Sequence, residues 1–184
     1  MKRIFLFFIF LHLQIFILCA QSIDDSTCWE YFEITQKLRN NEPLGKGVWN
    51  SFLSDPAIQV YLKDQGVDSA YIENYRQIME IVYMPKNENV LNERLKDQNK
   101  NWWTYIVNEY RLHEEEMKSY LQNLEKEKDD YFKIAYSYSY QMLPKDYRKT
   151  APGYKVTIIP VHNDAHIENE WMVFSLMASY FSVI

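Results

Sequence analysis

The distribution of apolar side chains predicts helix over most of the chain. From about residue 26 to residue 142, apolar positions recur every three or four residues, which is the period of an amphipathic helix. Residues suited to helix ends divide this region: Asp55 and Pro56 favour the start of a helix, and Gly66 favours its end. The predicted helices cover about residues 26–40, 48–53, 56–65, 69–84, 89–100, 101–126 and 129–142.

The pattern changes after Pro152 and Gly153. The segment 155–161 is the first run rich in β-branched residues, and it predicts a strand. The polar segment 162–170 predicts a loop, and the apolar segment Trp171–Ile184 predicts a second strand that runs into a final helix or strand. We therefore expect a mostly α fold: a multi-helix, bundle-like domain with a small C-terminal β element (α+β), with strand only after about residue 153.

The first 20 residues have the pattern of a Sec-type signal peptide. Lys2 and Arg3 precede an apolar run, and Ala20 offers a small residue at the cleavage position. An uncleaved anchor is the alternative, but an interrupted run of roughly 17 residues is marginal for crossing a bilayer. We expect removal of residues 1–20, one domain over residues 21–184, no stable membrane span after cleavage, and a periplasmic or extracellular location.

The charge of the chain and its cysteine content exclude some classes of function and one kind of crosslink. The chain has 184 residues, with 20 Lys and Arg against 25 Asp and Glu. An acidic chain with scattered basic residues lacks the basic face that phosphates require, so we expect no nucleic-acid partner. After cleavage Cys28 is the only cysteine, which excludes an intramolecular disulfide, and its apolar neighbours predict a buried small side chain.

Two histidines are the weak candidates for metal ligands. His162 and His166 are four residues apart, a spacing that puts two imidazoles on one face of a helix, as zinc binding needs. The zinc-peptidase motif also needs a Glu directly after the first His, and Asn163 stands there. Pro160 and the polar surroundings favour a solvated loop with two ordinary histidines. The sequence predicts no catalytic residue and no cofactor-binding residue.

Other chemistry-bearing groups have structural interpretations. His113 lies in an apolar helical stripe and is predicted as a core or rim histidine. The acidic runs at 114–116 and 125–130 are predicted to be solvated helix faces. Core packing is the first interpretation of the aromatic residues, and a peptide- or sugar-binding face is the alternative. These aromatic residues are Trp49, Trp102, Trp103, Tyr136, Tyr138 and Tyr140.

The order of several short features resembles that of the secreted bacterial putative zinc-dependent peptidases of the gluzincin type. Trp29 and Phe32 stand in the first helix, the turn that follows contains Glu42 and Pro43, and Trp49 stands in the next helix. The helical region then closes on the pair Leu143 and Pro144. The resemblance implies that the strands lead to a catalytic helix carrying His-Glu-x-x-His.

The sequence contains no such motif, so no catalytic or metal residue is carried over from the family. We expect the N-terminal helical part of a zinc-peptidase-like protein, truncated after Ile184 and inactive, with zinc bound only if a longer chain carries the motif. The alternative is a self-sufficient secreted helical domain that binds a peptide or protein partner through its aromatic surface. We also expect self-association through Trp171–Ile184, because an uncharged apolar strand edge is a template for another chain.

Overall fold

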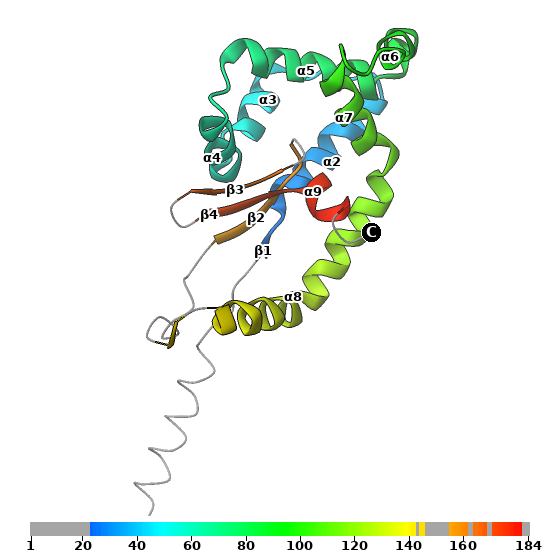
Figure 1. Cartoon of the computed structure of the whole chain (residues 1–184). Helices are drawn as coiled ribbons and strands as arrows, with labels where there is room; N and C mark the ends of the chain where they lie inside the picture. The colour runs from blue at the N-terminus through cyan, green and yellow to red at the C-terminus, as the bar shows by residue number, and fades with distance from the viewer. Residues whose placement is uncertain (1–22, 143, 146–154, 162–163, 169–170, 182–184) are drawn as a thin grey trace, which may run out of the picture.

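The computed structural model describes residues 23–142, 144–145, 155–161, 164–168 and 171–181. It consists mostly of helices that surround a small sheet, as the hydrophobic pattern predicts (Figure 1). The segment predicted as a signal peptide, His162 and the pair Pro152 and Gly153 lie outside the described residues. Within those residues, no helix is both long and apolar enough to cross a membrane.

The helices follow the predicted segments closely in the first half of the chain, except that the helix predicted over residues 89–100 ends at Leu95. Asp55 caps a helix with its side chain, which accepts hydrogen bonds from the backbone N–H groups of Ala57 and Ile58. Gly66, at φ +60°, follows the same helix and takes the left-handed conformation that other residues adopt at a cost. The helices of this half are α2 (Ser26–Arg39), α3 (Lys46–Leu53), α4 (Pro56–Asp64), α5 (Ser69–Tyr83), the short 3₁₀ helix η1 (Pro85–Asn87) and α6 (Glu88–Leu95).

The long helical region is divided at a different point from the one expected. Helix α7 (Trp102–Leu112) ends at His113, and α8 (Glu114–Met142) then continues without interruption through residues 126–129. The predicted helices 101–126 and 129–142 are therefore wrong in their boundaries. Three glutamates begin α8, and acidic side chains in a first turn stabilise the positive end of the helix dipole. The apolar period is the same on both sides of His113, so it could not reveal the break.

A four-stranded sheet joins the two ends of the described chain. Its strands are β1 (Ile23–Asp24), β2 (Lys155–Ile159), β3 (Ala165–Glu168) and β4 (Trp171–Ser175), in the order β1-β2-β4-β3. The pairs β1–β2 and β2–β4 are parallel, and β3–β4 is antiparallel. Helix α9 (Leu176–Phe181) follows β4 directly.

Two expectations about the strands are wrong. Strand is not confined to the region after residue 153, because β1 pairs with β2 near the start of the chain. The polar segment 162–170 is not only a loop, because β3 lies within it. Both elements are short and owe their strand conformation to pairing with distant segments, which local residue preferences do not reveal. In addition, β4 lies between β2 and β3, so it has no open edge.

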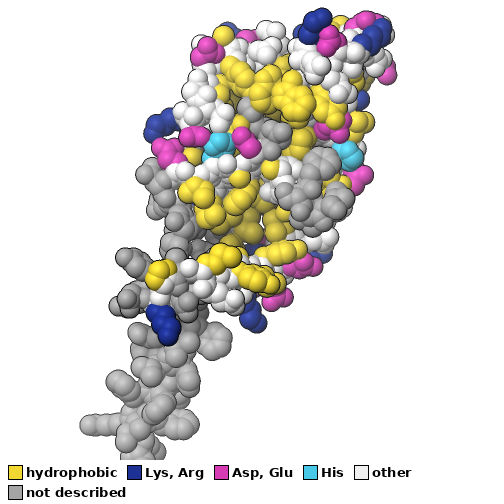
Figure 2. Space-filling view, viewed as in Figure 1, with side chains coloured by type: hydrophobic (Ala, Val, Ile, Leu, Met, Phe, Trp, Pro, Cys, Tyr) yellow, Lys and Arg dark blue, Asp and Glu magenta, His cyan; other side chains and the backbone are white. Residues whose placement is uncertain are grey.

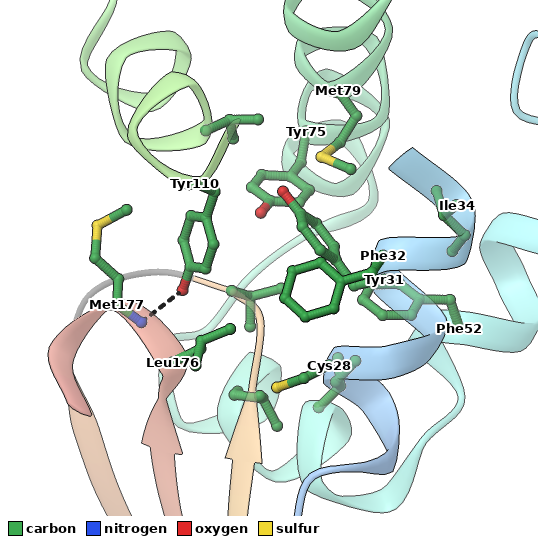
Figure 3. Close-up of a cluster of buried hydrophobic side chains, with 14 of the residues drawn as sticks. Cys28, Tyr31, Phe32, Ile34, Phe52, Tyr75, Met79, Tyr110, Leu176 and Met177 are labelled. Atoms are coloured by element: carbon green, nitrogen blue, oxygen red, sulfur yellow. Dashed lines mark hydrogen bonds between the residues drawn. The ribbon is translucent and has the colours of Figure 1, made fainter. Parts of the chain in front are cut away.

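Buried tyrosines dominate the core between α2, α5, α7 and the sheet (Figure 3). The hydroxyl groups of Tyr31 and Tyr83 lie 3.1 Å apart and share a hydrogen bond. The Tyr110 hydroxyl bonds to Ser175 Oγ at 3.0 Å and accepts the backbone N–H of Met177 at 3.2 Å. These bonds tie α2 to α5, and α7 to the junction of β4 and α9.

The core also contains Cys28, as predicted. Its side chain is fully buried, and its Sγ donates to the backbone oxygen of Ile158 at 3.2 Å. Burial raises the pKa of this thiol well above its usual range, which disfavours the reactive thiolate. Cys28 therefore has a structural role and connects α2 to β2.

Candidate functional site around His166

His166 lies on the edge strand β3, facing helix α4. Its Nδ1 atom lies 2.5 Å from the Asp64 carboxylate, and its Nε2 atom lies 3.2 Å from the Asp164 carboxylate. The ring of Tyr61 meets the imidazole edge-on, with 4.7 Å between ring centroids. Only 14% of the His166 side chain is exposed. The site is a partly buried cluster of one histidine, two carboxylates and an aromatic ring.

Neighbouring elements hold these groups in place. Asp64 is the last residue of α4, whose apolar face packs on β2 and β4. The backbone oxygen of Asp164 accepts the N–H of Ser175 at 2.8 Å, which fixes the start of β3 against the end of β4. The sheet therefore brings together side chains that are 100 residues apart in the sequence.

The cluster also affects two tyrosines. Burial raises the pKa of Tyr61 and Tyr71, and the negative charge of Asp164 raises both further. Both phenols stay protonated at neutral pH and can donate hydrogen bonds. Their environment does not activate them as nucleophiles.

The described residues do not fit a catalytic zinc ion. A zinc site of this kind needs about three protein ligands with free lone pairs. Both ring nitrogens of His166 are already in contact with other side chains: Nδ1 with the Asp64 carboxylate, and Nε2 with the Asp164 carboxylate and Gln65. Neither nitrogen is therefore open to a metal ion. Among the described residues, no group of three His, Cys, Asp or Glu side chains is arranged to hold a metal ion. His162 lies outside those residues, so its role stays a prediction.

The junction of α7 and α8 contains a partial match to the zinc-peptidase motif. His113 is followed by Glu114, the first two residues of His-Glu-x-x-His, but Met117 stands where the second histidine belongs. Met117 is fully buried in the core. Sequence reasoning considered His113 alone and missed this partial match, which the next residue in the chain could have revealed.

Glu114 is held by cations on two helices. Its Oε2 atom lies 2.6 Å from Nη2 of Arg39 on α2, and its Oε1 atom lies 2.8 Å from Nζ of Lys118 on α8. Thr35 Oγ1 donates to the same carboxylate at 3.3 Å. Only 6% of Glu114 is exposed, so the prediction of a solvated face at 114–116 is wrong for this residue. The carboxylate joins two helices and is not available as a general base.

A cleft lies beside this ion-pair network. Its volume is about 720 Å³, and its lining includes Trp29, Phe32, Arg39, Arg111 and Lys118. Four glutamates also line it, which offsets the three basic side chains. This balance favours neither an anionic nor a strongly cationic small ligand.

The aromatic candidates are distributed among different environments. Trp49 is buried and stacks on Tyr75 with ring centroids 5.9 Å apart, which supports the core-packing interpretation. Trp102 is 46% exposed and, together with Trp103, lines a second cleft of about 490 Å³. Tyr138 is exposed on α8, whereas the side chains of Tyr136 and Tyr140 lie outside what the structure describes.

Comparison with known proteins gives one family. The sequence model of a family described as "putative zinc dependent peptidase" matches residues 49–182, from α3 to the end of α9. No curated protein and no solved structure gives a significant match. The match covers most of the chain and includes His162, His166 and the sheet, apart from β1.

Proposed function

Because the chain belongs to the family of putative zinc-dependent peptidases, we propose that it is an exported, peptidase-like domain that does not hydrolyse peptides by itself. The main supporting observation is the position of His166, whose two ring nitrogens both contact carboxylates and are not open to a metal ion. The partial motif at His113 supports the same conclusion, since its glutamate is bound by Arg39 and Lys118.

The first residues of the chain support export. The basic start, the apolar run and the small Ala20 form a Sec-type signal, and β1 begins at Ile23, just after the expected cleavage position. Cleavage after Ala20 would leave this strand in the mature protein. We therefore place the mature domain in the periplasm or outside the cell.

The test is a joint measurement of zinc content and peptide hydrolysis. The full chain is expressed in an exporting host, and the secreted form is purified and dialysed against zinc-free buffer. We expect far less than one zinc per chain and no cleavage of an unstructured casein substrate above the buffer rate.

Two variants make the test specific. The double variant His162→Ala/His166→Ala removes the candidate pair, and His113→Ala removes a histidine on a different element as the matched control. We expect all three proteins to have the same low zinc content. One zinc per chain that is lost in the double variant and kept in His113→Ala would overturn the proposal.

The cleft lined by Trp102 and Trp103 favours a second function, the binding of a peptide or sugar. Stacking surfaces and amide groups from Asn99 and Asn101 meet there, which is the chemistry that sugar rings and extended peptides use. Screening glycan and peptide arrays with the secreted protein tests this function. Trp102→Ala should abolish any specific binding, whereas the exposed Val90→Ala on α6 should leave it unchanged.

A further inference from the structure

The second half of α8 carries an apolar stripe with no covering element among the described residues. Met117 and Leu121 are buried in the core, and Leu124 packs against it. After Lys128, the same face continues at alternating steps of three and four through Tyr131, Ala135, Tyr138 and Met142, and Ile134 lies at its border. The exposed fractions along this part of the helix are 46% for Tyr131, 54% for Ile134, 62% for Tyr138 and 83% for Met142.

The shape of the molecule explains why the stripe is open. Helix α8 has 29 residues, which corresponds to about 43 Å, and its second half extends past the packed body (Figure 1). Figure 2 shows hydrophobic side chains along this helix at the lower end of the body. A repeat of seven residues with two apolar positions is the pattern by which two helices pack together.

We propose that the occupant of this stripe is the same helix of a second copy, packed antiparallel. The exposed parts of Tyr131, Ile134, Tyr138 and Met142 amount to about 500 Å² per copy, or about 1,000 Å² for a pair, near the lower limit for a specific interface. Polar side chains on both sides of the stripe would form the border of this interface. An area near this limit is typical of a weak, concentration-dependent association.

Charge decides the direction of the two helices. The run 125–130 has four acidic and two basic residues, whereas residues 139–142 at the end of α8 are uncharged. Parallel helices would place the two acidic runs side by side, which is unfavourable. An antiparallel pair centred between Ile134 and Ala135 instead places the acidic run of each copy beside residues 139–142 of the other, which carry no charge. It also brings Tyr131 of each copy to the level of Tyr138 of the other, around the small Ala135.

This interface is independent of the proposed function and differs from the expected one at Trp171–Ile184, because β4 lies inside the sheet. Sedimentation equilibrium of the secreted protein, up to about 100 µM, should show a concentration-dependent mass that approaches twice that of the chain. Ile134→Glu should weaken the dimer at least tenfold. Ser137→Glu adds the same charge away from the stripe and should leave the association unchanged.

Cysteine crosslinking tests the direction. In the antiparallel pair, Ala135→Cys lies next to its own copy and should form an interchain disulfide under mild oxidation. Glu127→Cys lies about 22 Å from its copy along the helices and should form none, whereas parallel helices would crosslink at both positions. A protein that stays monomeric throughout, an Ile134→Glu variant that associates as well as the native chain, or crosslinking at position 127 would overturn the proposal.

Discussion

The hydroxyl of Tyr110 accepts the backbone N–H of Met177 at a distance of 3.2 Å, joining two residues that are 67 positions apart (Figure 3). Met177 lies in the first turn of α9, where backbone N–H groups have no partner within the helix. The tyrosine side chain therefore performs a capping role that a neighbouring residue usually has. The same hydroxyl bonds to Ser175 Oγ, so one side chain fixes the passage from β4 into α9.

Replacing Tyr110 by Phe should destabilise the domain by about 1–3 kcal/mol, because the N–H of Met177 and the hydroxyl of Ser175 lose this buried partner. Urea unfolding measured by circular dichroism gives the change. Tyr138→Phe removes a hydroxyl from an exposed ring and should not move the midpoint. Equal midpoints for the two variants would show that the capping bond contributes nothing.

Glu114 and Glu115 provide a matched pair of carboxylates on one helix turn. Both bind Lys118, but the side chain of Glu114 is 7% exposed and that of Glu115 is 83% exposed. Glu114→Gln should cost about 1–2 kcal/mol, because the buried carboxylate loses its charge-assisted bonds while Arg39 and Lys118 keep partial contact with water. Glu115→Gln should have no measurable effect, since exposed pairs contribute little. Thermal unfolding of the two variants at neutral pH separates these outcomes.

Alkaline pH should unfold the domain cooperatively. Burial raises the pKa of Tyr31, Tyr75, Tyr83 and Tyr110 above the value of about 10 for a free tyrosine. Above pH 10 the unfolded chain releases these protons while the folded chain keeps them, so stability falls as the pH rises. Each tyrosine contributes a slope of about 1.4 kcal/mol per pH unit.

The absorbance of tyrosinate near 295 nm and the helical circular dichroism signal, followed together from pH 8 to 12.5, check this prediction. Tyrosines outside the core should ionise first, without loss of helix. The buried group should ionise only in the step in which the helical signal disappears. Smooth ionisation of all tyrosines in the folded protein would contradict it. In the Tyr83→Phe variant, the free energy of unfolding should fall less steeply with pH, by the contribution of a single tyrosine.

Two glycines should respond to alanine with opposite signs. Gly66 has φ +60°, so Gly66→Ala places a side chain in a strained conformation and should cost about 1–2 kcal/mol. Gly47 lies inside α3 with no other atom within 4 Å of an added Cβ, so Gly47→Ala should stabilise by about 0.5–1 kcal/mol. Chemical unfolding of both variants tests the pair. Destabilisation by Gly47→Ala would indicate that the start of α3 needs glycine for another reason.

The helices of the first half could be predicted because their signals are local. Asp55, Pro56 and Gly66 mark the two ends of α4, and the structure uses each of them as the sequence indicates. The break at His113 was not predictable from the apolar period, which continues through it. Strand β1 has only two residues and depends on a partner segment more than 130 positions away. No local preference identifies such a pairing.

The candidate site also depends on contacts between distant segments, which local sequence signals do not reveal. The sequence singles out His166 from its spacing to His162, but the residues that determine its chemistry are Asp64 and Asp164. Asp164 is near in sequence, whereas Asp64 reaches the imidazole only because α4 packs on the sheet. Likewise, the charge run at 114–116 indicates a solvated face, and only the position of Arg39 on α2 explains why Glu114 is buried.

The parallel pairing of β1 with β2 has a consequence for the order of folding. The first strand must wait for a partner that is synthesised more than 130 residues later, and β2 in turn pairs with β4, near residue 175. Contacts between such distant segments form slowly, because a long loop must close first. During synthesis the helices can form early while the sheet stays open. A chain whose sheet closes last stays loosely packed until residues 155–175 have been synthesised, so its final packing follows synthesis instead of accompanying it.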